Sequence, residues 1–222
     1  MKKLLLTFLI ILFTLSFNVG CSGGSGDLDK GIKAYENGDY KTAVREWKPL
    51  AKKGDAIAQH KLGRMYRDGK GVSKDYKTAV KWFRLGAEQG YASAELSLGY
   101  MYQQGYGVPK DEKTGVKWYR LAADQGYDLA QYNLGWSYSE GSGVSKNDKT
   151  AIKWYTLAAE QGNGDAMNNL GAIYNNGEGV PKNYKTAGKW LRLGAEQGVA
   201  SAQYNLGLLY YHGRGVPQND KT

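Results

Sequence analysis

Apolar residues recur with a helical period over most of this chain. Between residues 56 and 91, Ala58, Leu62 and Tyr66 are spaced four apart, which places them on one face of a helix. A second apolar set follows with the spacing of another helical face: Tyr76, Ala79, Val80, Phe83 and Ala87. The stretch therefore predicts two antiparallel helices of about 12–15 residues each, joined by a loop.

This helix pair recurs every 36 residues without insertion or deletion. The motif Ala58-x3-Leu62-Gly63 returns four more times, and Trp82 and Gly90 return in every complete unit. The complete units are 56–91, 92–127, 128–163 and 164–199, with a divergent unit before them and an incomplete one after them. One helix pair cannot cover its own apolar face, so the units must stack into a superhelix.

Turn and capping residues mark the helix ends in each unit. Gly69 and Gly71 follow the first helix, where glycine accepts the left-handed conformation. Residues of a favoured N-cap type precede the second helices: Asp75, Asp111, Asn147, Asn183 and Asn219. Gly63 recurs inside the first helix, where glycine costs about 1 kcal/mol relative to alanine. Its recurrence predicts a neighbouring helix too close to allow a methyl group.

The combined pattern of A-x-x-x-L-G, G-x-G, an Asp or Asn cap, a tryptophan and a final Gln-Gly closely resembles Sel1-like repeats. These are relatives of the tetratricopeptide repeat. The resemblance covers residues 56–222 and, more loosely, 27–55, where a first helix is expected around 29–37. It implies an all-α fold, a right-handed superhelical solenoid of antiparallel helix pairs, with the first helices lining the concave face.

The N-terminal residues predict export. A basic start, Met1-Lys2-Lys3, precedes an apolar run from Leu4 to Phe17, which is typical of a signal peptide over residues 1–20. The run is shorter than the roughly 20 residues that span a bilayer. A membrane anchor that stays attached is the alternative.

Cys21, the only cysteine, directly follows this run. Val19-Gly20-Cys21 resembles the lipobox of bacterial lipoproteins, although Asn18 departs from the usual pattern. We expect Cys21 to be lipidated and residues 21–26 to form a flexible tether. A free thiol after an ordinary signal cleavage is the alternative. Since Ser22 resembles an outer-membrane sorting signal, we expect a periplasm-facing lipoprotein of the outer membrane in the bacterial cell envelope.

The unit that starts at residue 200 stops before its tryptophan-bearing second helix. We therefore expect the repeat array over 56–222 to contain four complete units and a truncated last one. The chain is then a fragment of a longer protein. Poor order in the last unit is the alternative.

The units differ from one another along one stripe of the first helix, at the positions of residues 57, 61, 64 and 68. The resemblance places this stripe in the concave groove. Aromatic rings and amides together suit an extended peptide, because rings supply apolar contact and amides bond to its backbone. The alternative is drift at free surface positions. The candidate binding residues are Arg64, Tyr100, Asn133, Trp136, Asn169, Asn205 and Leu208.

Two other rows of residues recur in register on the second helices. The tryptophans equivalent to Trp82 suggest either sugar-stacking platforms or packing between units, and their fixed position beside the apolar face favours packing. The lysines equivalent to Lys77 and Lys81 form a ladder within a net charge of +9. A nucleic-acid or anionic-lipid contact is one interpretation. We favour a solvated face, and export argues against nucleic acid.

The chain offers no constellation for catalysis or for a cofactor. A single cysteine excludes a disulfide framework and any Cys-rich metal site, and two histidines that lie far apart leave little for His-based catalysis. We expect His60 and His212 to be solvated. Some secreted Sel1-like proteins are described as penicillin-binding or β-lactamase-like, but those carry a cysteine pair in each unit, so we do not transfer that activity.

The sequence thus predicts a non-catalytic scaffold that binds a protein or peptide in its groove and is held at the membrane by its lipid. The alternative is an envelope hydrolase or glycan-binding protein acting on peptidoglycan-related substrates. A purely structural or toxin-neutralising surface protein is a third possibility.

Overall fold

The computed structural model describes residues 26–214, and this part of the chain is entirely helical, with eleven helices and no strand. They are α1 (Leu28–Glu36), α2 (Tyr40–Lys52), α3 (Ala56–Asp68), α4 (Tyr76–Ala87), α5 (Ala92–Gln104), α6 (Glu112–Asp124), α7 (Asp128–Glu140), α8 (Asp148–Glu160), α9 (Gly164–Asn176), α10 (Tyr184–Glu196) and α11 (Ala200–Tyr211). The predicted signal peptide, Cys21, Asn219 and Lys221 lie outside the described residues.

The expected caps set the helix boundaries. Asp75 and its equivalents Asp111, Asn147 and Asn183 each accept a hydrogen bond from the backbone N–H of the threonine three residues later. At the other end of the first helices, Gly69 has a φ of 70° and closes α3 in the left-handed conformation. The predicted start and stop signals are therefore confirmed.

Close packing within each pair explains the recurrent glycine. A Cβ on Gly63 would lie 2.6 Å from the Phe83 ring, and one on Gly135 would lie 2.7 Å from the Tyr155 ring. No real side chain tolerates such contacts without movement of the neighbour. The predicted absence of room for a methyl group is confirmed at positions 63, 99, 135 and 171, while at Gly207 none of the described residues comes within 4 Å of an added Cβ.

The hydrophobic core lies between consecutive pairs. Each core cluster joins the second helix of one pair to the first helix of the next: α2 to α3, α4 to α5, α6 to α7, α8 to α9 and α10 to α11. Trp82 packs on the α2–α3 cluster and Trp154 lies within the α6–α7 cluster. The interpretation of the tryptophans as packing between units is therefore confirmed. Tyr76 differs from expectation because it is only half-buried.

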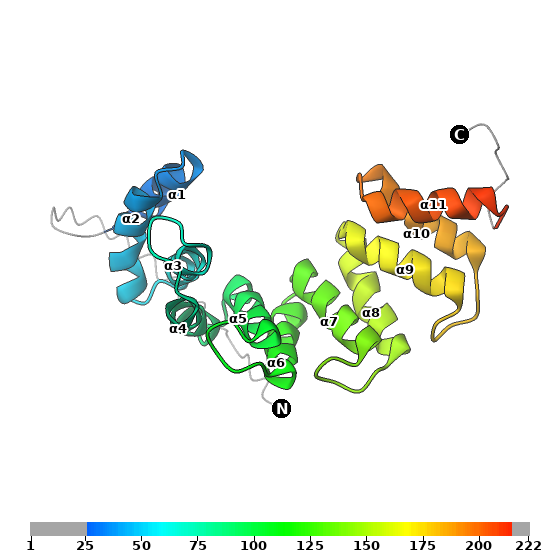
Figure 1. Ribbon diagram of the computed structural model, residues 1–222, viewed down its shortest axis with the longest axis horizontal. Helices are drawn as coiled ribbons and strands as arrows, with labels where there is room; N and C mark the ends of the chain where they lie inside the picture. Colours follow the sequence, from blue (N-terminus) through cyan, green and yellow to red (C-terminus); the bar gives the residue numbers. More distant parts are fainter. Residues whose placement is uncertain (1–25, 215–222) are drawn as a thin grey trace, which may run out of the picture.

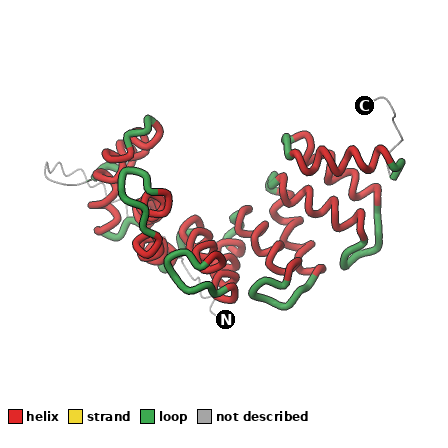
Figure 2. Tube along the Cα trace, in the orientation of Figure 1, coloured by secondary structure: helices red, strands yellow, loops and turns green. Residues whose placement is uncertain are grey.

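Stacked in this way, the pairs follow an arc that is open on one side (Figure 1). The loops between the helices run along its edges (Figure 2). Hydrogen bonds between pairs reinforce the stack, because Arg84 on α4 donates to the Tyr102 hydroxyl on α5 at 2.7 Å and Arg192 repeats the bond to Tyr210. The result is the predicted solenoid of antiparallel helix pairs.

Candidate functional site

The first helix of each pair lies on the inner side of the arc. In Figure 1, α1, α3 and α5 lie toward the open side, with α2, α4 and α6 behind them. First helices of neighbouring pairs also approach closely enough to bond directly. The His60 ring on α3 lies 3.1 Å from the Ser97 hydroxyl on α5, and Asn205 on α11 donates to Asn168 on α9 at 2.9 Å. The concave face is therefore built from α3, α5, α7, α9 and α11.

The seven candidate binding residues all line hollows on this face. Arg64 borders a small hollow beside Trp47, and Tyr100 and Asn133 border a hollow of about 600 Å³. Trp136 and Asn169 line a hollow of about 310 Å³ between α7 and α9. A hollow of about 170 Å³ on α11 contains Asn205 and Leu208. The comparison of units thus identified residues that follow one another along the inner surface.

The hollow of about 600 Å³, which we name the tyrosine hollow, is lined by tyrosines from three segments. Tyr76 at the start of α4 and Tyr106 in the α5–α6 loop stack with ring centroids 4.8 Å apart and planes 8° apart. Tyr100 on α5 meets Tyr106 edge-on at 6.0 Å. Leu96 adds an apolar surface, and the Lys74 ammonium lies 4.7 Å from the centre of the Tyr76 ring. The hollow therefore offers aromatic surface beside hydroxyl groups and a cation.

Basic residues of α3 border two hollows: Arg67 lines the tyrosine hollow, and Lys61 and Arg64 line the small hollow beside Trp47. Arg67 donates to the Asp68 carboxylate twice, at 2.7 and 3.1 Å, and this hydrogen bonding raises the pKa of the Arg67 guanidinium. Lys61 is half-buried beside Arg64, so burial and the neighbouring cation lower the pKa of the Lys61 ammonium. This part of the concave face carries more positive charge than its single ion pair neutralises.

The comparison with known families decides the identity of the repeat. A family model described as the Sel1 repeat matches residues 56–91, 92–127, 128–163, 164–199 and 200–222, which together make up most of the chain. This chain belongs to the Sel1 repeat family. Sel1 repeats form a scaffold fold that generally mediates protein–protein interactions.

Solved structures agree with this assignment. A protective antigen present in uropathogenic Escherichia coli strains, with an SLR fold, is 39% identical with a TM-score of 0.82; the match covers 86% of this chain and 42% of that chain. The chain thus spans less than half of that relative. A Sel1 repeat protein from Oxalobacter formigenes is 35% identical with a TM-score of 0.80, over 87% of this chain and 79% of that one.

A more distant match shares the fold alone. Immunity protein Pa5087 from Pseudomonas aeruginosa is 20% identical with a TM-score of 0.54, and the match covers 82% of this chain and 74% of that one. No curated protein matches the chain.

Comparing the repeats with one another missed several residues of the concave surface of this Sel1 repeat chain. Tyr76, Tyr106, Lys74 and Arg67 border the tyrosine hollow but lie outside the four variable positions of the first helix. Tyr106 could have been found by comparing the repeats, because its position varies between them: the equivalent residues are Lys70, Ser142 and Glu178. Lys74 could not have been found in this way, since every complete unit has lysine at that position.

His60 corrects an expectation. The sequence predicted a solvated side chain, but the ring is only 9% exposed and packs against Phe83 and Tyr91 at centroid distances of 5.7 and 5.6 Å. Burial, together with the charges of Arg64, Lys61 and Arg67, lowers the pKa of the His60 imidazole to about 3. His60 is a packing residue between α3 and α5, whereas His212 is exposed as expected.

The described residues show few groups suited to other chemistry. Within residues 26–214, no three His, Cys, Asp or Glu side chains lie close enough together to hold a metal ion. No helix in this part of the chain has the length and apolar character needed to cross a membrane. What this face offers is a row of hollows lined by rings, amides and charged groups.

Proposed function

We propose that this chain is a non-catalytic scaffold of the bacterial envelope that binds a protein or peptide segment along its concave face. One observation carries the proposal: at two of the four variable positions, those of residues 61 and 64, the residue of every repeat from α3 to α11 lines one of the successive hollows on that face. Packing dictates the invariant positions, so the variable ones are where the repeats are free to differ for a ligand.

The face is suited to recognition without rearrangement. Helices α3, α5, α7 and α9 of this face end in left-handed glycine caps and make close glycine contacts, and hydrogen bonds join neighbouring pairs. A surface that is already ordered loses little conformational entropy when it binds. Trp136, which is 43% exposed, is the largest apolar side chain of the set and the expected anchor of the interaction.

Site-specific photocrosslinking in envelope fractions tests this proposal. We expect a photoreactive residue at position 136 to capture a defined protein, and the same residue at position 121 to capture none. Leu121 is the matched control, because it is 48% exposed but lies on the second helix α6. With the captured partner in hand, Trp136→Ala should weaken binding about tenfold. Equal capture at both positions would contradict the proposal.

Membrane attachment through Cys21 is the second part of the proposal. The apolar run before Cys21 and the Val19-Gly20-Cys21 motif support it. Cells fed a clickable palmitate analogue should label the wild-type chain and not the Cys21→Ser variant. Labelling that persists in the variant would contradict lipidation at this residue.

A further inference from the structure

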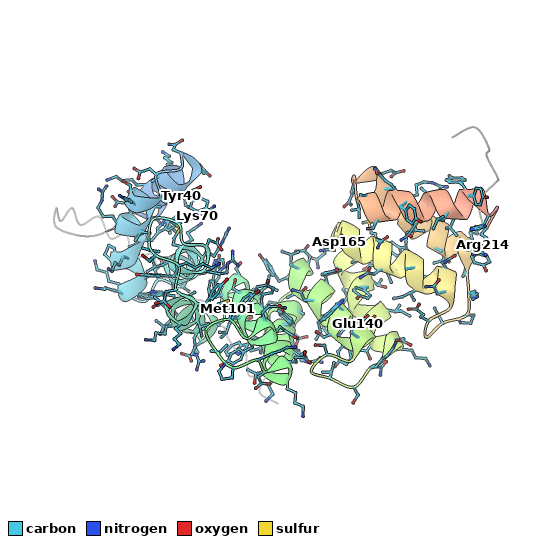
Figure 3. All side chains as sticks on the ribbon, viewed as in Figure 1. Tyr40, Lys70, Met101, Glu140, Asp165 and Arg214 are labelled. Carbon is cyan, nitrogen blue, oxygen red and sulfur yellow. The ribbon has the colours of Figure 1, made fainter. Side chains whose placement is uncertain are left out.

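The concave face is electrically uneven between α3 and α9, and beyond them Arg214 lines the hollow on α11. Helix α3 contributes Lys61, Arg64 and Arg67, whereas α5, α7, α9 and α11 contain no lysine or arginine. Farther along, the hollow beside Trp136 is instead bordered by Glu140 and Glu178. Figure 3 shows Lys70 at one end of the arc, with Glu140 and Asp165 on the other half.

The cations at the α3 end are held in place by aromatic rings. The Lys61 ammonium lies 5.3 Å from the Trp47 ring centre. The Lys70 ammonium lies 4.9 Å from the Tyr40 ring and donates to the Tyr35 hydroxyl at 3.1 Å. Lys74 lies over Tyr76 in the same way. Such side chains are already ordered, so pairing them with an anion costs less entropy than pairing free lysines.

These cations lack acidic partners within the described chain. The only ion pair formed by α3 is the one between Arg67 and Asp68, and Lys61, Arg64, Lys70 and Lys74 form none within residues 26–214. Arg64 and Lys61 lie side by side on α3, and the charge of Arg64 helps to lower the pKa of the Lys61 ammonium. A ligand with several carboxylates would relieve this mutual repulsion.

We propose that the segment bound by the concave face is an extended peptide with a cluster of Asp and Glu side chains, which lies over α3 and the tyrosine hollow. Its neutral residues then extend toward Trp136 and Asn169. The charge gradient fixes the direction in which the segment lies. This proposal rests on the proposed peptide-binding function and adds the chemistry of the ligand.

Selection from a displayed library of random peptides, with the full chain as bait, tests the ligand chemistry. We expect the selected peptides to contain clusters of Asp and Glu well above the library average. Binding of individual labelled peptides, measured by fluorescence anisotropy, should weaken about tenfold in the double variant Arg64→Glu, Lys74→Glu. It should also weaken with added salt, and less so in that variant.

The matched control is the double variant Lys77→Glu, Lys113→Glu. It makes the same change in net charge at exposed residues of the second helices, so it should keep affinity within about twofold of wild type. Circular dichroism checks that both variants stay helical; all four side chains are exposed.

The remaining outcomes separate this inference from the proposed function. Peptides without an acidic excess that still lose affinity with Trp136→Ala would overturn the acidic ligand and leave the peptide-binding function standing. Equal losses in the two double variants would also overturn it. If no peptide is enriched, the result counts against the proposed function itself.

Discussion

At the scale of single residues, buried amides at one register tie consecutive helix pairs together. Gln59 donates to the Ala51 carbonyl at 3.1 Å, and Gln131 donates to the Ala123 carbonyl at 3.3 Å. Glu95 occupies the same register, is only 3% exposed, and accepts a hydrogen bond from Gln125 at 2.8 Å. An ionised carboxylate has no proton to donate to the equivalent carbonyl, and burial raises the pKa of Glu95 above its ordinary 4.5.

Glu95→Gln should therefore stabilise the protein at pH 7 by about 1 kcal/mol, because the new amide can donate as its equivalents do. Since folding raises the carboxyl pKa, the contribution of Glu95 is complete below pH 4.5 and is lost as the pH rises through the folded-state value. The advantage of the variant should vanish near pH 4 in thermal melts. The reverse change, Gln131→Glu, should destabilise the protein at pH 7, and an unchanged melting temperature would contradict the argument.

His60 should make stability depend on pH in the opposite direction. Folding lowers the pKa of its imidazole from 6.5 to about 3, so stability is complete above pH 6.5 and falls as acid protonates the unfolded chain. The free energy of unfolding should therefore be about 2–3 kcal/mol lower at pH 4.5 than at pH 7 because of this histidine. His60→Gln should remove that loss in urea titrations at the two pH values. His212→Gln, at an exposed residue, is the control and should leave the loss intact.

At the scale of helices, the recurrent glycine position should give opposite results on α7 and on α11 when it is changed to alanine. Gly135→Ala should destabilise by about 1–3 kcal/mol, because the added methyl group meets the Tyr155 ring at 2.7 Å. Gly207→Ala should stabilise the protein by up to about 1 kcal/mol, since no atom of residues 26–214 lies within 4 Å of its Cβ and alanine favours the helix. Differential scanning calorimetry on the two variants measures the contrast. A loss of stability at both positions would show that the close helix contact is not the cause.

The helices could be predicted from sequence because their determinants are local. The cap at Asp75 and the spacing of Ala58 and Leu62 are set within one unit, and the recurrence of Gly63 revealed its close contact. His60 could not be placed in this way, since Phe83, Tyr91 and Ser97 bury it from three other segments. The stacked Tyr76 and Tyr106 pair was also missed, because it joins the start of α4 to the α5–α6 loop, 30 residues away in the sequence.

At the scale of the molecule, each part of the arc should depend for its stability on the neighbouring helix pairs alone. Each core cluster joins only two consecutive pairs, so a defect affects its neighbours and not the whole arc. Leu134 is fully buried in the α6–α7 cluster. Its replacement by alanine should lower the free energy of unfolding by about 2–5 kcal/mol.

Hydrogen exchange measured by mass spectrometry locates that loss. In Leu134→Ala, amides of α6, α7 and α8 should exchange faster, while those of α2 and α3 keep their protection, because their core cluster shares no residue with that of Leu134. Leu62→Ala, in the α2–α3 cluster, is the matched control and should reverse the pattern. If either variant lost protection evenly over all the helices, the arc would unfold as one unit. Its concave face would then act as a single site and not as a row of separable ones.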